Sequence, residues 1–157
     1  MRVLVLCKTY PDNSGEVSLM YVHTRNKYYK ENGIEVVVLN FSAKEDYIYE
    51  GIKVITLKSY YERNDQYDLL IAHAANIKNH YLFILRNGSK FPVYLFFFHG
   101  HEVLNINKVY SKPYSFVKKN KFKMIGQSIY DFVKLRIWNR FYTKNSDKSK
   151  FVFVSHW

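Results

Sequence analysis

Two histidines follow two neighbouring apolar runs of this sequence, and they are the residues best placed to do chemistry. His73 comes directly after the run at 67–72, and His99 comes directly after the run at 93–98. If both runs are parallel strands, their carboxyl ends lie at one edge of the sheet, where open α/β sheets collect ligands. An imidazole titrates near neutral pH, so it can bind a substrate hydroxyl or exchange a proton. We therefore expect a site at this edge.

The residues after His99 also invite a metal interpretation. His99 is followed by Gly100, His101 and Glu102. Two neutral imidazoles two residues apart can share one ion, but zinc needs further ligands, and only Glu102 and His73 are obvious candidates. A Ser/His/Asp triad is disfavoured as well, because no Gly-x-Ser-x-Gly elbow is present. We expect no bound metal and no tightly bound cofactor.

A polar loop follows the first apolar run, at the same expected edge. It contains Asn13, Ser14 and Gly15 and comes just ahead of a predicted helix that begins at Val17. Backbone amides that are free at such a place can meet a phosphate or a sugar hydroxyl. A single glycine matches neither the Gly-x-Gly-x-x-Gly fingerprint nor a P-loop, so a dinucleotide or ATP site is disfavoured. A plain surface loop is the alternative interpretation.

These residues need a scaffold, and the sequence predicts one of α/β class. Apolar runs alternate with amphipathic stretches, which is typical of a Rossmann-like, mostly parallel sheet of about six strands with helices on both faces. The expected strands are residues 2–7, 35–40, 52–57, 67–72, 93–98 and 151–155. The expected helices are 17–32 with a left-handed Gly33 behind it, 77–87 with Asn76 and Gly88 as caps, and 127–142. The third strand follows the second too closely for a crossover helix, so it is expected to enter differently or to lie at an edge.

Length and composition predict one folded domain. The 157 residues with 48% hydrophobic composition can bury a core, and they differ from the profile of a disordered chain. The only cysteine, Cys7, lies in the first apolar run, so there is no disulfide framework and a reducing, cytosolic setting is the simpler assumption. No stretch approaches the roughly 20 apolar residues of a spanning helix, so any membrane contact is expected to be peripheral.

Positive charge is concentrated in the last third of the chain. Of the net charge of +11, residues 108–157 contribute +10, with 12 Lys/Arg against 2 Asp/Glu. Such a block favours an anionic partner, although a solvated basic face is the alternative. Residues 105–125, where lysines alternate with apolar residues, are expected to form a long functional loop with short helical turns. The candidates for binding phosphate or anionic lipid are Lys118, Lys119, Lys121, Lys123, Arg136 and Arg140.

The two arginines of this set have an unusual position. At 100° per residue Arg136 and Arg140 fall on the same helical stripe as four apolar residues, Ile125, Ile129, Phe132 and Val133. Guanidinium groups on an apolar stripe either find anions or extend outward beside a core.

The order of these motifs resembles the amino-terminal domain of GT-B fold glycosyltransferases of the family-4 type. It comprises a first strand, a loop from Tyr10-Pro11 to Gly15, a helix ending at Gly33, and a second strand at 34–39. There follow Asp68 to His73, His99-Gly100 and Phe153-Val154-Ser155. The motifs are short, and their specificity lies in their order and spacing along nearly the whole chain.

The resemblance implies an amino-terminal, acceptor-side domain of a two-domain retaining hexosyltransferase. Its donor would be a nucleotide-diphosphate sugar, held mainly by a second domain that is absent from this chain, and its acceptor a glycan or lipid-linked sugar. The Gly15 loop would approach the donor, His99 the transferred sugar, and His73 the acceptor. Glu102 would orient His99 or an acceptor hydroxyl, and Gly100 and His101 would lie beside it. Many relatives have two glycines in the first loop, whereas here Ser14 precedes a single Gly15.

The same resemblance implies a role in cell-surface polysaccharide synthesis, in the cytoplasm at the inner face of the cell membrane. The isolated domain is expected to be inactive or nearly so. Anionic lipid is the expected partner of the basic segment. A basic nucleic-acid or anionic-ligand binding module with a Rossmann-like fold is the competing hypothesis, but no helix-turn-helix, zinc-finger or RNA-recognition signature accompanies the basic residues, so no nucleic acid is expected. A flavodoxin-like binding domain is disfavoured, since no aspartate cluster follows the first strand.

Overall fold

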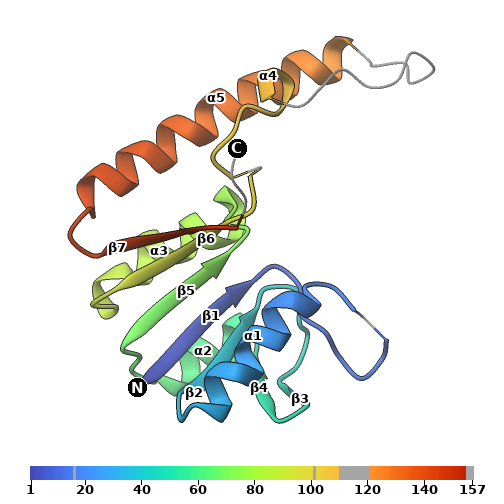
Figure 1. The fold of residues 1–157 in the computed structure, drawn as a ribbon, viewed down its shortest axis with the longest axis vertical. Coiled ribbons are helices and arrows are strands. Elements are labelled where there is room, and N and C mark those ends of the chain that lie inside the picture. Colours follow the sequence, from blue (N-terminus) through green and yellow to red (C-terminus); the bar gives the residue numbers. More distant parts are fainter. Residues whose placement is uncertain (16, 101, 110–120, 155–157) are drawn as a thin grey trace.

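A single seven-stranded sheet organises the domain (Figure 1). The computed structural model describes residues 1–15, 17–100, 102–109 and 121–154. In these ranges the strand order is β3-β4-β2-β1-β5-β6-β7, and every neighbouring pair is parallel except β3 with β4. The strands are β1 Arg2–Cys7, β2 Glu35–Asn40, β3 Tyr47–Tyr49, β4 Ile52–Ile55, β5 Leu69–His73, β6 Tyr94–Phe98 and β7 Ser149–Phe153.

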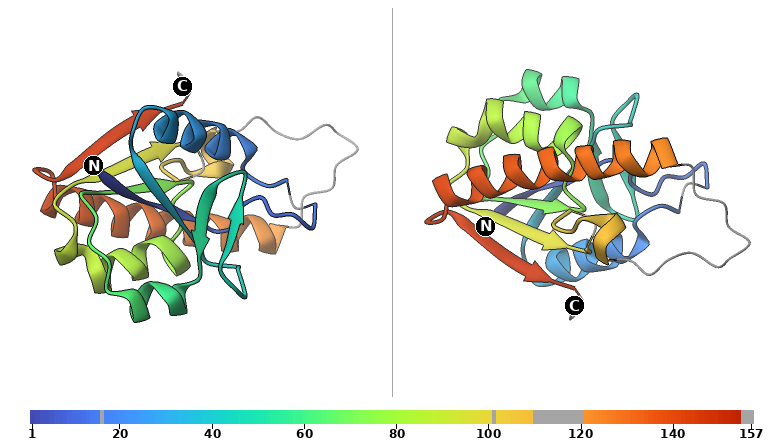
Figure 2. Two further views of the ribbon diagram at one scale, coloured as in Figure 1. Left: turned by 90° about the horizontal axis from the view of Figure 1, so that it is seen from below. Right: turned by 90° about the horizontal axis from the view of Figure 1, so that it is seen from above.

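Helices lie on both faces of the sheet. Their bounds are α1 Met20–Glu31, α2 Leu57–Arg63, α3 Leu82–Asn87, α4 Ile106–Val109 and α5 Lys121–Lys144. A π-helical turn, η1 Ile77–Tyr81, leads into α3, and a 3₁₀ turn, η2 Gly88–Lys90, follows it. One face carries α1 and the other carries α2, α3 and α5, as the two views of Figure 2 show. This distribution follows from right-handed crossovers, because the chain moves one way from β1 to β2 and the opposite way from β5 to β7.

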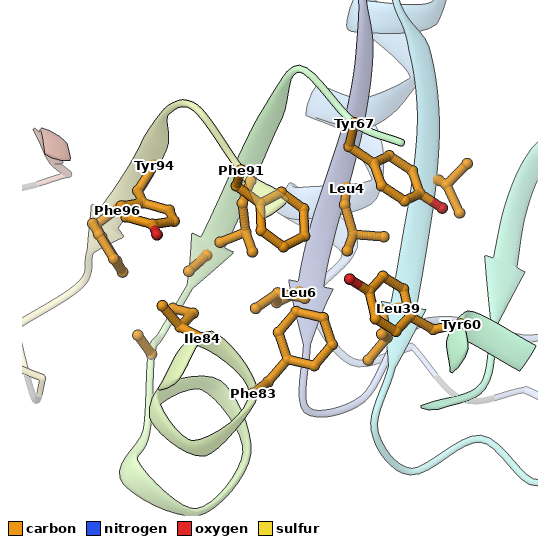
Figure 3. Close-up of a cluster of buried hydrophobic side chains, with 14 of the residues drawn as sticks. Leu4, Leu6, Leu39, Tyr60, Tyr67, Phe83, Ile84, Phe91, Tyr94 and Phe96 are labelled. Carbon is orange, nitrogen blue, oxygen red and sulfur yellow. The ribbon is translucent and has the colours of Figure 1, made fainter. Parts of the chain in front are cut away.

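The core has two layers because side chains alternate along each strand. On β1, Val3, Val5 and Cys7 pack on the α1 side, whereas Leu4 and Leu6 pack on the other side. Figure 3 shows the second layer, where Leu4 and Leu6 lie among the aromatic side chains of Tyr60, Phe83 and Phe91, and Tyr94 and Phe96 of β6 extend the layer farther along the sheet. Cys7 is buried and free, and its burial raises the pKa of the thiol.

The α/β class and the six expected strands are confirmed, with small shifts at their ends. The last strand covers 149–153 rather than 151–155. β4 does lie close to an edge, and the strand outside it, β3, was not expected. Glu50 and Gly51 both have positive φ, which makes the tight turn that folds β3 back on β4. Helix α2 was also not expected.

Three expectations about helix ends meet different outcomes. Gly33 has the left-handed φ of 77° that was expected behind α1. The start at Val17 was wrong, because Leu19 adopts a left-handed conformation and its carbonyl accepts the first helical hydrogen bonds, so α1 begins at Met20. Asn76 caps η1 through its side chain and Gly88 is the C-cap of α3, both as expected, although Gly88 has a helical φ of −60°. A Cβ at Gly88 would lie 2.7 Å from the Tyr94 hydroxyl, so close packing explains this glycine.

The expected loop at 105–125 is wrong at its second end. The short helix α4 at 106–109 agrees with the expected helical turns, but α5 already begins at Lys121, which makes it longer than the expected 127–142. Residues 110–120 lie outside the described residues. Among the described helices none is both long enough and apolar enough to cross a membrane.

Candidate functional site

The direction of the sheet fixes where ligands can bind. The chain runs from β1 to β2 and β4 on one side of β1, and from β5 to β6 and β7 on the other. The loops at the carboxyl ends of the neighbouring strands β1 and β5 therefore turn toward opposite faces of the sheet. Open parallel sheets bind ligands in the crevice between two such loops, where the strand order reverses. The loops after β1, β5 and β6 carry the expected site residues.

His73 and His99 do lie together at this edge. Their ring centroids are 6.1 Å apart. Tyr21, from the first turn of α1, contacts both: its ring centroid is 4.9 Å from that of His99 and 6.3 Å from that of His73. The Tyr21 hydroxyl lies 3.4 Å from Nε2 of His99. We call these three residues the histidine cluster.

His73 is the most unusual member of the histidine cluster. Its side chain is 1% exposed, and neither ring nitrogen has a hydrogen-bond partner among the residues that the structure describes. The imidazole stacks on Phe97 at 4.5 Å, and the Arg25 guanidinium lies over the same Phe97 ring at 4.2 Å. Burial, helped by the positive charge of Arg25, lowers the pKa of His73 to about 3. His73 is therefore neutral at physiological pH, and it keeps unused hydrogen-bonding capacity at the binding edge.

His99 is more accessible and is also held neutral. Its side chain is half-buried, and burial lowers its pKa, with Glu102 opposing this shift and Arg25 adding to it. A neutral imidazole can donate from one nitrogen and accept at the other. His99 can thus hold a sugar hydroxyl without carrying a full charge.

Glu102 acts on the backbone of this segment. It is 6% exposed, and its Oε2 accepts the backbone N–H of His99 at 3.0 Å. Gly100 has a φ of 116°, a conformation that a residue with a Cβ rarely adopts. The Glu102 carboxylate and Gly100 therefore shape the turn that presents the His99 ring. His101 lies outside the described residues.

A polar pocket of about 630 Å³ adjoins the loop after β1. Asn13 and Ser14 line it as expected, but Gly15 does not belong to its lining. The opposite wall comes from the loop after β2, which the sequence did not single out: Asn40, Ser42, Ala43, Lys44 and Glu45. Gly15 precedes α1 by five residues rather than directly, so its amide is not part of the first helical turn.

A buried hydrogen-bond network fixes the loop after β1. The Tyr10 hydroxyl is buried, lies 2.8 Å from Nδ1 of His23 and accepts from Asn26 Nδ2 at 3.2 Å. The Tyr10 carbonyl in turn accepts from the Tyr47 hydroxyl on β3. Because both walls of the pocket are tied to this network, the pocket is a preformed feature.

An ion pair buried under α5 fixes the loop after β6. Asp131 Oδ1 accepts from Lys134 Nζ at 2.7 Å, and Asp131 Oδ2 accepts the backbone N–H of Ile106 at 2.9 Å. Lys134 also donates to the Leu104 carbonyl. Burial would raise the pKa of Asp131, but these hydrogen bonds outweigh it and hold the pKa below its usual range. The loop that carries His99 is therefore anchored to α5.

The candidate phosphate-binding residues lie elsewhere. Lys121, Lys123, Arg136 and Arg140 are all exposed on α5, and none of them belongs to the histidine cluster. Lys118 and Lys119 lie outside the described residues. Within the described ranges, no group of three or more His, Cys, Asp or Glu side chains is arranged to hold a metal ion.

No protein-family model matches this chain, and no curated protein matches it either.

Proposed function

We propose that this chain is the acceptor-side domain of a glycosyltransferase that transfers a hexosyl group from a nucleotide-diphosphate sugar. The acceptor would be the hydroxyl of a glycan or lipid-linked sugar. The observation that carries the proposal is His73, a buried imidazole beside His99 at the carboxyl edge of a parallel sheet, whose two nitrogens have no partner in the described part of the chain. Buried polar groups without partners are uncommon, and each calls for an explanation, of which a bound ligand is one.

The polar pocket supports a carbohydrate as the ligand. Its lining offers amide, hydroxyl, amino and carboxylate groups from Asn13, Ser14, Asn40, Lys44 and Glu45. Such a mixture of donors and acceptors suits a neutral polyol, which needs both, better than an inorganic anion. The pocket would hold the acceptor, while the Asn13 to Gly15 loop would face the donor.

The roles of the site residues follow from their geometry. His99 would accept a hydrogen bond from a hydroxyl of the transferred sugar near the reacting carbon. This bond would strengthen as positive charge develops on the sugar ring, because the hydroxyl becomes a better donor. Tyr21 and Glu102 would position His99, the first at its Nε2 and the second at its backbone. A second domain would supply most of the contacts to the nucleotide, and transfer would occur in the cleft between the domains. We place the complete enzyme in the cytoplasm, at the inner face of the cell membrane, in polysaccharide synthesis.

Replacement of His99 tests the proposal. In the full-length protein, His99→Ala should lower transfer, measured as release of nucleoside diphosphate, by about a hundredfold or more, the usual loss for one transition-state hydrogen bond. The matched pair Tyr21→Phe and Tyr28→Phe provides a control on one helix. Tyr21→Phe should lower transfer because it removes the contact to Nε2, whereas Tyr28 is 63% exposed on α1, so Tyr28→Phe should leave transfer unchanged. Full activity of His99→Ala would refute the role of the cluster.

A second measurement tests the pocket in this chain alone. Neutral saccharides titrated into the isotope-labelled domain should shift amide resonances of the loops after β1 and β2, and Asn13→Ala with Asn40→Ala should weaken the shifts. Shifts confined to other parts of the sheet would contradict an acceptor site here.

A further inference from the structure

Helix α5 presents an apolar stripe to the outside of the molecule. Figure 1 shows α5 as the outermost element on its side of the sheet, with α4 beside it. Four members of the stripe are between 47% and 62% exposed, although they are large apolar side chains: Ile125, Ile129, Phe132 and Val133. The residues that pack on the sheet, such as Trp138 and Tyr142, lie on the opposite side of the helix. The stripe is therefore a second apolar face, which the core does not use.

Positive charge accompanies this face, and negative charge does not. Arg136 and Arg140 continue the same stripe, within an arc of about 100° on a helical projection. Lys121 and Lys123 lie exposed near the start of the helix. The single acidic residue of α5, Asp131, is fully buried in its pair with Lys134. In the described part of the chain, no ion pair joins Arg136 or Arg140 to a carboxylate.

The carboxyl-terminal end of the stripe adjoins a groove between α3 and α5. This groove measures about 480 Å³ and is lined by apolar side chains that include Ile84, Leu85 and Ile137. Arg140 and Lys144 belong to the same lining. An apolar groove with two cations in its wall fits a molecule with an apolar body and an anionic head.

We propose that this surface of α5 docks on an anionic phospholipid bilayer. The apolar stripe would enter the interfacial region, Arg136 and Arg140 would contact lipid phosphates, and the groove at Arg140 and Lys144 would seat one lipid headgroup with part of its chain. An interfacial helix combines an apolar face with flanking cations in this way, and each cation near an anionic surface contributes a modest amount that adds to the next.

The first turns of the docking helix and the histidine cluster lie toward the same edge of the sheet, whereas the groove at Arg140 and Lys144 lies toward the other. Helix α5 follows the carboxyl end of β6 in the chain and returns to the start of β7, so its first turns lie toward the carboxyl edge. Docking through these turns would bring the candidate site close to the membrane surface. The membrane contact is independent of the transferase chemistry, and only its link to a lipid-linked acceptor rests on the proposed function.

Flotation of the purified chain with vesicles tests the proposal. Vesicles of phosphatidylcholine mixed with phosphatidylglycerol should carry the chain, and vesicles of phosphatidylcholine alone should carry little. Arg136→Gln with Arg140→Gln should weaken partitioning about 30-fold, since each cation near the surface contributes a factor of about five. The matched control is Lys58→Gln with Lys90→Gln, which removes the same charge from two exposed lysines outside α5 and should change partitioning by less than about threefold.

A second variant separates insertion from charge attraction. Ile129→Ser with Phe132→Ser should weaken partitioning by about tenfold or more, because both side chains are more than half exposed and can be buried only in the bilayer. The far-UV circular dichroism spectrum should stay unchanged, since neither residue packs in the core.

Three results would overturn the proposal. One is equal partitioning of the Arg136/Arg140 variant and its lysine control. Another is binding to phosphatidylglycerol vesicles that survives Ile129→Ser with Phe132→Ser unchanged. The third is a stable dimer in solution, seen by sedimentation velocity, that this apolar variant dissociates, because the stripe would then be an interface between two copies. Transfer to a water-soluble acceptor by the full-length protein reports on the proposed function separately, so the failure of one idea can be told from the failure of the other.

Discussion

Acid should destabilise this domain well above the pH at which its carboxylates titrate. Two buried imidazoles carry the effect: burial lowers the pKa of His73 to about 3 and that of His80 to about 4. In the unfolded chain both return to the ordinary value near 6.5. Between pH 7 and pH 5 the unfolded state therefore binds protons that the folded state does not bind. The free energy of unfolding consequently falls as the pH falls.

The size of the effect follows from these pKa values. Each imidazole contributes a loss of about 2 kcal/mol between pH 7 and pH 5, and the two together about 4 kcal/mol. The lowered pKa of His99 acts in the same direction. The carboxylates with lowered pKa values, such as Asp46 and Asp131, lose their contribution to stability only below pH 5. They therefore do not alter the pH dependence between pH 7 and pH 5. The loss is a large part of the stability of an ordinary domain.

Urea unfolding at pH 7, 6 and 5, followed by circular dichroism, measures the effect, and two variants assign it. His73→Phe removes an imidazole that makes no hydrogen bond to any described residue, and it keeps a ring against Phe97, so it should halve the pH dependence without lowering stability at pH 7. His80→Phe should also halve the pH dependence. It should, however, cost about 1 to 3 kcal/mol at pH 7, because the imidazole contacts the Leu6 carbonyl and accepts from the Asn76 N–H.

A free energy of unfolding that stays level within about 1 kcal/mol between pH 7 and pH 5 would refute the reasoning, since it would mean that neither imidazole is excluded from protonation. An unchanged slope in His73→Phe would refute the assignment to His73 alone. A gain in stability at pH 7 for His73→Phe, together with loss of transfer in the full-length protein, would indicate that this imidazole is kept at the expense of stability.

Three further substitutions probe the framework of the site. Lys134→Met should lower the free energy of unfolding by about 3 kcal/mol, since it leaves the Asp131 carboxylate buried without its ion pair, and chemical denaturation measures this loss. Gly88→Ala should destabilise by about 1 to 3 kcal/mol because its Cβ meets the Tyr94 hydroxyl at 2.7 Å, and Tyr94→Phe should recover most of the loss in a double-mutant cycle. Tyr10→Phe should cost about 1 to 3 kcal/mol by removing the hydroxyl of a buried network, and it should speed hydrogen exchange in the loop after β1.

The parts of the fold that the sequence predicted are those in which local pattern and burial agree. Strands such as β1 and β6 are continuous apolar runs because the sheet covers them on both faces, so their position can be found without knowledge of their neighbours. β3 has only three residues and exists through its pairing with β4, which no local pattern reveals. Helix α2 carried a usable signal, since the Thr56 side chain accepts the Ser59 N–H as an N-cap, but its seven residues are too few for a clear periodicity.

The residues of the candidate site likewise include some that local sequence pattern predicts and some that it does not. His73 and His99 could be predicted because a strand end places a residue at the edge whatever the rest of the chain does. Tyr21 and Arg25 could not, because they come from a helix whose facing residues depend on where it begins. The left-handed conformation of Leu19 sets the start of the helix, and no residue type around Leu19 predicts that conformation. The exposed stripe on α5 had the correct members in the sequence, but periodicity alone cannot tell a face that packs on a core from a face that meets a lipid or a partner.

The loop after β6 connects the two proposals physically. At one end Glu102 holds the backbone of His99, and at the other the Leu104 carbonyl and the Ile106 N–H are bound by the Lys134 and Asp131 pair of α5. The candidate catalytic histidine and the candidate docking helix are thus joined through buried, charge-assisted hydrogen bonds rather than through a free linker. A membrane that binds α5 would accordingly fix the height of His99 above the lipid, and Lys134→Met should disturb both properties at once. If flotation of Lys134→Met stays intact while transfer falls, the ion pair positions the loop and not the docking surface. Loss of both would mean that α5 itself needs the pair to hold its place on the sheet.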